Sequence, residues 1–133
     1  LIPKGGADLI VSMEPMEALR YLPYLSPKGW IVTSTLPFVN IDNYPDLESV
    51  KAELQKHGNV VAFDMEAAAK EVASARSSNL VLLGAASPFI DTPAEAIEKA
   101  IASVFGSKGE AIVNANIAAF RLGRTRAVEM AKI

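Results

Sequence analysis

The chain has 133 residues and is 50% hydrophobic, which is enough for one compact domain with a buried core. Its 13 basic and 15 acidic residues give a net charge of -2 with no long basic run, which excludes an obvious nucleic-acid groove or anionic membrane surface. Cysteine is absent and His57 is the single histidine, so the chain alone cannot hold an iron–sulfur cluster or a structural zinc ion. The longest apolar stretch is too short to span a bilayer, and we expect a soluble, cytoplasmic protein without disulfides.

The first predicted elements lie between residues 7 and 30. Residues 8–11 are an apolar run typical of a strand, and Pro15 opens a helical pattern whose apolar positions share one face. A proline eight residues later ends or kinks that helix, and residues 26–29 predict a turn before a second strand at residues 30–32. Two buried parallel strands joined through a helix predict a right-handed βαβ unit.

The same residues resemble a known family. The similarity is carried by Ile2-Pro3, Gly6-Ala7-Asp8, Glu14-Pro15, Glu17-Ala18-Leu19-Arg20 and Leu22-Pro23-Tyr24-Leu25. This pattern resembles the gamma-type domain of the pyruvate/2-oxoacid:ferredoxin oxidoreductase family, most closely the small (beta) subunits of indolepyruvate ferredoxin oxidoreductases.

Two motifs of that family are not found in this sequence. Family members start with a strand and a Gly-x-Gly-Gly-Gln-Gly turn, followed later by Ser-Gln-Arg-Gly-Gly, whereas this sequence begins with a loop-like stretch at Leu1. We therefore expect residues 1–133 to form a single domain that corresponds to the C-terminal portion of the gamma-type domain, lacking its N-terminal part.

The middle of the chain predicts a loop, a helix and a third strand. Residues 37–45 are rich in proline and asparagine and predict a surface loop, and a helix follows that Gly58 is expected to end. His57 falls in its last turn, where a favourable cation is the better interpretation than a catalytic base. Residues 60–63 predict a buried strand, and Asp64 is the expected N-cap of an alanine-rich helix at residues 65–75.

Helices are predicted for the remainder of the chain. Residues 79–86 fit either a buried strand or a buried helix by periodicity, and the family resemblance implies a helix. Thr92 and Ser107 begin two capping-box patterns, and Gly106 and Gly123 are the expected helix stops. Asn116 lies in mid-helix, where its poor helix propensity favours a buried or interfacial hydrogen bond.

Candidate site residues follow from the predicted sheet. Ligands of open parallel sheets collect beyond the carboxyl ends of the strands, and the weak candidates there for cofactor binding are Ser12, Glu14, Ser34, Asp64 and Glu66. The three carboxylates also sit at helix starts, where the free N–H groups stabilise them, and we favour that structural interpretation. Arg20 is expected to pair with Glu17. The catalytic residues stay unassigned, because the chain shows no nucleophile–base set, metal cluster or phosphate-binding glycine loop.

The predicted fold class is α/β, a Rossmann-like parallel sheet flanked by helices. The resemblance implies a subunit of a 2-oxoacid oxidoreductase that converts a 2-oxoacid to an acyl-CoA and reduces ferredoxin. Thiamine diphosphate, iron–sulfur clusters and CoA are then expected in the assembled complex, and no cofactor in this chain. The implied partners are a large subunit and, through the complex, ferredoxin; a homodimer is a further option. We expect no activity from the chain alone, and partner contacts through exposed apolar sides of residues 65–75 and 79–86.

Two alternatives from other classes remain open at this point. A stand-alone nucleotide-binding dehydrogenase would need a glycine-rich turn upstream of Leu1, which the full gene sequence would reveal. A non-enzymatic interaction module would have the same fold without oxidoreductase genes beside its own.

Overall fold

The computed structural model describes residues 1–37 and 43–133. Its internal contacts divide the chain into two compact units, Leu1–Asp64 and Met65–Ile133. The central part of the predicted loop at residues 37–45, residues 38–42, lies outside the described residues.

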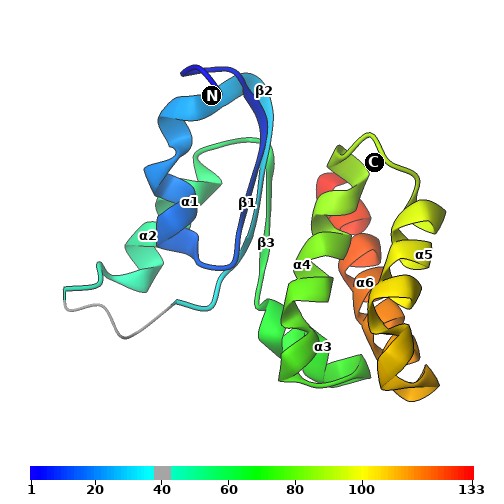
Figure 1. The fold of residues 1–133 in the computed structure, drawn as a ribbon. Helices are drawn as coiled ribbons and strands as arrows, with labels where there is room; N and C mark the ends of the chain where they lie inside the picture. The colour runs from blue at the N-terminus through cyan, green and yellow to red at the C-terminus, as the bar shows by residue number, and fades with distance from the viewer. Residues whose placement is uncertain (38–42) are drawn as a thin grey trace. The chain divides into compact units, whose positions relative to one another are not determined.

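The first unit is a parallel β-sheet with helices (Figure 1). Its elements are, in order, β1 (Ala7–Ser12), α1 (Pro15–Arg20), a 3-10 turn (Leu22–Tyr24), β2 (Leu25–Ser34), α2 (Leu47–Gln55) and β3 (Val60–Phe63). The strand order is β1-β2-β3, and both strand pairs are parallel. Both helices lie on the same side of the sheet in Figure 1, and Ala18 and Leu54 share a core with Ile10 and Ile31. The predicted α/β class is confirmed.

The second strand begins earlier than the sequence pattern indicated. Ala7 pairs with Leu25 and Leu9 pairs with Trp30, so the predicted turn at residues 26–29 is a bulge inside β2 instead of a turn before it. Gly29 fits there because a Cβ at this position would lie 2.4 Å from Leu25 Cδ1 and 3.0 Å from the Ala7 carbonyl oxygen. A proline and a glycine therefore mark an irregular strand here, as they commonly do.

The helix before β3 also differs from expectation at its end. α2 ends at Gln55 with Lys56 as its C-cap, so Gly58 is not its stop. His57 follows the helix, and its backbone N–H donates to the Leu54 carbonyl at 3.1 Å. The glycine prediction was wrong because the last turn closes through these backbone bonds without a left-handed residue.

The second unit consists of helices joined by short connecting segments (Figure 1). Its α-helices are α3 (Met65–Val72), α4 (Ser78–Ala86), α5 (Ala94–Phe105) and α6 (Glu110–Ala131), with 3-10 turns at Ala75–Ser77, Ser87–Phe89 and Gly106–Lys108. The helix that the family resemblance implied for residues 79–86 is confirmed as α4. The alanine-rich helix begins at Met65 as predicted and ends at Val72, three residues earlier than expected. No helix among the described residues is both long enough and apolar enough to cross a membrane.

Two glycines allow α4 and α6 to cross at very short range. A Cβ at Gly84 would lie 1.9 Å from the Phe120 carbonyl oxygen, and a Cβ at Gly123 would lie 2.0 Å from the Val81 carbonyl oxygen. Gly123 was expected to stop its helix, but α6 continues to Ala131. That prediction was wrong because this glycine provides space for the neighbouring backbone, which a local pattern does not reveal.

Side-chain caps are also absent where the sequence suggested them. The N-cap of α5 is Pro93 and the N-cap of α6 is Gly109, and neither helix start has a side-chain capping hydrogen bond. Thr92 therefore precedes the cap, and Ser107 lies inside a 3-10 turn. Gly106 does follow the last residue of α5, as predicted.

Candidate functional site

The carboxyl ends of the three strands lie along one edge of the first unit. Ser12 is the last residue of β1 and pairs with Thr33, while Ser34 is the last residue of β2 and pairs with Phe63. The Thr35 N–H donates to the Phe63 carbonyl at 3.0 Å, which keeps the chain leaving β2 beside the end of β3. The register therefore brings Ser12, Ser34 and the residue after β3, Asp64, to the same edge of the sheet.

Glu14 is the most enclosed of the candidate residues, with 1% of its surface exposed. Its two carboxylate oxygens accept from the backbone N–H groups of Met16 at 2.9 Å and Glu17 at 3.1 Å, so it caps α1. Ser12 Oγ completes the turn by accepting from the Glu14 N–H at 3.1 Å and donating to the Glu14 carbonyl at 2.6 Å. These contacts agree with the structural interpretation of Glu14, whose oxygens are engaged in holding the helix start.

Tyr44 adds a hydrogen bond that the sequence did not suggest. Its hydroxyl donates to Glu14 Oε1. Burial raises the pKa of this hydroxyl well above its ordinary value, and the hydrogen bond to Glu14 and the charge of that carboxylate raise it further. The phenol therefore keeps its proton and joins the residues before α2 to the start of α1. No sequence signal links the two residues, which are 30 positions apart.

The remaining candidates have different surroundings. Ser34 is buried, and its Oγ accepts from the Leu36 N–H at 3.4 Å. Asp64 is exposed immediately before α3. Glu66 lies on α3 in the second unit, where it pairs with Lys70 at 3.5 Å. Arg20 pairs with Glu17 at 2.6 Å, as predicted.

The chemistry available at this edge is hydrogen bonding and negative charge. Across residues 1–37 and 43–133, no group of three or more His, Cys, Asp or Glu side chains could hold a metal ion. His57 belongs to a different end of the sheet, since it lies just before the start of β3 and lines a hollow with Asn59. Ser12, Glu14 and Ser34 at this edge are engaged in local hydrogen bonds.

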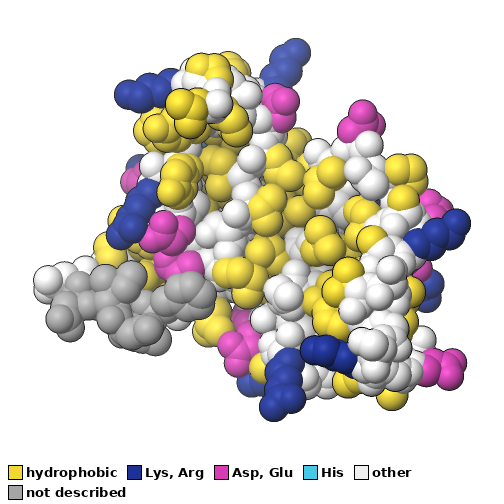
Figure 2. All heavy atoms as spheres, in the orientation of Figure 1, with side chains coloured by type: hydrophobic (Ala, Val, Ile, Leu, Met, Phe, Trp, Pro, Cys, Tyr) yellow, Lys and Arg dark blue, Asp and Glu magenta, His cyan; other side chains and the backbone are white. Residues whose placement is uncertain are grey.

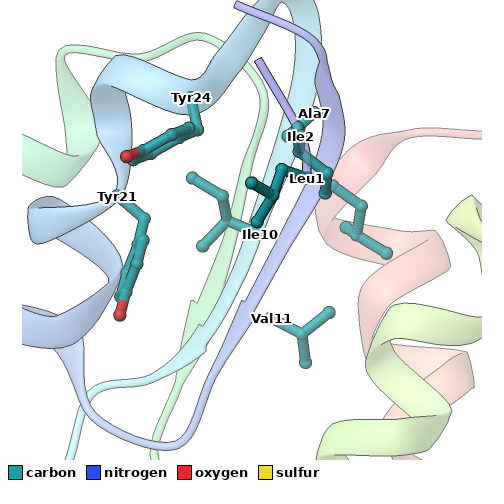
Figure 3. A pocket seen from close by; sticks show the side chains of 8 residues that line it. Leu1, Ile2, Ala7, Ile10, Val11, Tyr21 and Tyr24 are labelled. Carbon is teal, nitrogen blue, oxygen red and sulfur yellow. The ribbon is translucent and has the colours of Figure 1, made fainter. Parts of the chain in front are cut away.

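A second feature of the first unit is an apolar cavity of about 570 Å³ beside β1. Figure 3 shows Ile10 pointing from the strand toward Tyr21 and Tyr24, whereas Val11 points to the other side of the strand. The two tyrosine rings lie 6.1 Å apart between centroids. The rest of the wall comes from Leu1, Ile2, Ala7 and Leu9. Figure 2 shows hydrophobic side chains gathered at the upper end of the first unit. Exposed apolar groups of this kind indicate a packing surface.

The partner surfaces expected on the helices are mostly buried. The buried residues of α4 are Leu80, Val81, Leu82, Gly84, Ala85 and Ala86. The expectation of an exposed apolar side was therefore wrong for α4, because this helix packs closely on α6 and also on α3. On α3, Met65, Ala68 and Ala69 are buried, while Val72 is exposed.

Polar groups hold the two ends of the α4–α6 pair. Ser77 Oγ donates to Asn116 Oδ1 at 2.8 Å, and both residues are buried, which confirms the hydrogen bond predicted for this asparagine. Toward the other end, Arg124 donates to Ser87 Oγ at 2.8 Å, and Ser87 donates to the Gly84 carbonyl at 2.6 Å. These bonds fix the register in which the two glycines meet their neighbours.

A family model described as "Pyruvate ferredoxin/flavodoxin oxidoreductase" matches residues 1–126. Two similar curated proteins carry the name "Indolepyruvate oxidoreductase subunit IorB". The one from Pyrococcus horikoshii is 36% identical over 140 residues, which cover 98% of this chain and 68% of the relative. The one from Methanothermobacter thermautotrophicus is 34% identical over 136 residues, which cover 97% of this chain and 69% of the relative.

A solved structure is similar over the whole chain. It is described as "2-oxoglutarate:ferredoxin oxidoreductase from Magnetococcus marinus with 2-oxoglutarate, coenzyme A and succinyl-CoA bound". The TM-score is 0.68 and the sequences are 26% identical, over 100% of this chain and 22% of that chain. The present chain thus spans only a small part of that larger protein.

Proposed function

This chain belongs to the pyruvate ferredoxin/flavodoxin oxidoreductase family, and we propose that it works as the small subunit of an indolepyruvate-type 2-oxoacid:ferredoxin oxidoreductase. The observation that carries the proposal is the similarity to indolepyruvate oxidoreductase subunits along nearly the entire chain. The reaction proposed for the assembled enzyme is oxidative decarboxylation of a 2-oxoacid to an acyl-CoA, with reduction of ferredoxin. We also propose that the enzyme acts in the cytoplasm.

The residues of this chain do not suit the iron–sulfur clusters that such a reaction uses. Decarboxylating a 2-oxoacid needs an electron sink such as thiamine diphosphate, and passing electrons to ferredoxin needs a redox relay such as iron–sulfur clusters. The chain contains no cysteine, and the buried carboxylate of Glu14 already accepts hydrogen bonds from two backbone N–H groups and the Tyr44 hydroxyl. We therefore propose that thiamine diphosphate, the clusters and CoA bind largely to other parts of the complex, and that this chain is inactive alone.

The proposed role of this chain is to complete the complex by packing against other parts of it. We propose that residues 1–133 correspond to the C-terminal portion of a gamma-type domain, and that the earlier portion of such a domain covers the cavity beside β1. The open side of this strand supports the proposal, because in the described part of the chain β1 pairs only with β2. The apolar wall formed with Tyr21 and Tyr24 would be shielded from water by such packing.

The test of the proposed function is co-expression with the large-subunit gene of the same organism. The two chains are expected to co-purify in a fixed ratio, whereas the small chain alone is expected to be colourless and free of metal. Light scattering on the separate small chain distinguishes a homodimer from a monomer. Failure of the two chains to co-purify, or an iron–sulfur absorption band in the isolated small chain, would overturn the proposal.

A further inference from the structure

The second unit contains a cavity of about 580 Å³ that the proposed function does not use. Figure 1 shows that the turn between α3 and α4 and the turn between α5 and α6 lie at the same end of this unit. Residues of both turns line the cavity. Its volume falls within the range that is typical for small-molecule sites. The residues that matter for its chemistry are Arg76, Leu80, Phe105, Lys108, Ile112 and Asn116.

A hydrogen-bond donor of a largely buried residue faces this cavity. Asn116 is 7% exposed, and its Oδ1 accepts from Ser77 Oγ at 2.8 Å. Its Nδ2 donates to no group among the described residues. Among those residues, every side-chain nitrogen or oxygen that is inaccessible to solvent has a hydrogen-bond partner. Because Nδ2 has no partner among them, it must be accessible, and Asn116 lines this cavity. A largely buried amide with an unused donor is well placed to bind a ligand oxygen.

Two cations complete a positive rim. Arg76 and Lys108 line the cavity, and neither makes an ion pair with any acidic side chain in the described part of the protein. The ammonium group of Lys108 lies 5.9 Å from the centroid of the Phe105 ring, so it stands beside the apolar wall. No aspartate or glutamate of residues 1–37 and 43–133 lines the cavity. The charged and polar groups thus favour an anion, since hydrogen bonds to a charged partner are the strongest available here.

The apolar residues define the remainder of the ligand. Leu80, Phe105 and Ile112 present hydrocarbon surface beside the cationic rim. We propose that this cavity binds a small organic anion, in which a carboxylate meets Arg76, Lys108 and Asn116 Nδ2 while an aromatic or aliphatic body lies against Phe105 and Ile112. The site belongs to this chain alone, and ligand binding there does not depend on the proposed function.

The experiment is an NMR titration of the isotopically labelled full chain with phenylacetate. We expect saturable shifts of the Asn116 side-chain amide signals and of the backbone signals of Arg76 and Lys108. 2-Phenylethanol, which has the same ring without the charge, is expected not to bind. The double variant Arg76→Ala, Lys108→Ala is expected to weaken phenylacetate at least about tenfold, because it removes both charged donors. Lys99→Ala, which removes an exposed cation of α5 that does not line the cavity, is expected to leave the affinity unchanged.

Other results of the same titrations would overturn the proposed binding of an organic anion. Absence of phenylacetate shifts around the cavity, equal binding of 2-phenylethanol, or unchanged affinity in the double variant would overturn the proposal. Tighter binding of inorganic phosphate than of phenylacetate would show that the cations bind an inorganic oxyanion, and this would overturn the proposed ligand class. Binding of a hexaglutamate peptide in place of phenylacetate would assign the surface to an acidic protein partner, with the same consequence.

Discussion

Replacement of Gly123 by alanine tests the close crossing of α4 and α6. The new Cβ would lie 2.0 Å from the Val81 carbonyl oxygen, so the two backbones must separate by about 1 Å before this contact reaches 3.0 Å. Overpacking against rigid backbone costs about 3 kcal/mol, and alanine recovers about 1 kcal/mol of helix propensity. We therefore expect Gly123→Ala to lower the free energy of unfolding by about 2 kcal/mol.

The matched control is Gly106→Ala. Gly106 has a right-handed backbone with φ of -56°, and a Cβ added there would meet no atom within 4 Å, so alanine is expected to raise stability by about 0.5 kcal/mol. Urea unfolding followed by circular dichroism measures mainly the second unit, which holds most of the helical residues, and the fluorescence of Trp30, the single tryptophan, reports on the first. The loss should appear in the helical transition. If Gly123→Ala were as stable as Gly106→Ala, the close crossing would be refuted.

Three further predictions concern side chains with defined partners. Tyr44→Phe is expected to lower the free energy of unfolding by about 1 kcal/mol, because the buried capping carboxylate loses a hydrogen-bond donor. Since the pKa of this tyrosine is raised in the folded protein, the difference between variant and wild type should shrink as the pH rises above about 10. A difference that does not change with pH would argue against the hydrogen bond. Glu98→Gln removes the paired hydrogen bonds from Arg121, which lower the pKa of Glu98. The variant should therefore be less stable than the wild type at pH 7, and this difference should disappear as the pH falls below about 4. Urea unfolding midpoints at both pH values measure the difference. Thr92→Ala and Ser107→Ala are each expected to change stability by less than about 0.5 kcal/mol, and a loss of 1 kcal/mol in thermal unfolding would restore the capping interpretation.

The order of strands and helices could be predicted because local patterns determine it. Apolar runs of strand length, Pro15 at a helix start and Glu14 before it were sufficient for the first βαβ unit and for the capping role of that carboxylate. The helical state of α4 was not accessible to periodicity, because nearly all of its faces are apolar and only the family resemblance favoured a helix.

The wrong predictions concern positions whose structure is determined by residues far away in the sequence. Gly123 resembles a helix stop when only its neighbours are considered, yet the structure uses it to admit the Val81 carbonyl. Ser107 matches a capping box, but the chain continues as a 3-10 turn to Gly109, whose φ of 100° starts α6. The bond between Tyr44 and Glu14 joins positions that no local rule connects. Helix ends and long-range hydrogen bonds therefore needed the structure.

The most direct test of the central claim is turnover by the reconstituted complex. The chain is co-expressed with the large subunit, and reduction of ferredoxin is measured with indolepyruvate and CoA, omitting each component in turn. We expect ferredoxin reduction that requires both chains, the 2-oxoacid and CoA, and no reduction by the small chain alone. Turnover by the purified small chain, or full activity of the large subunit without it, would contradict the proposed role of this chain.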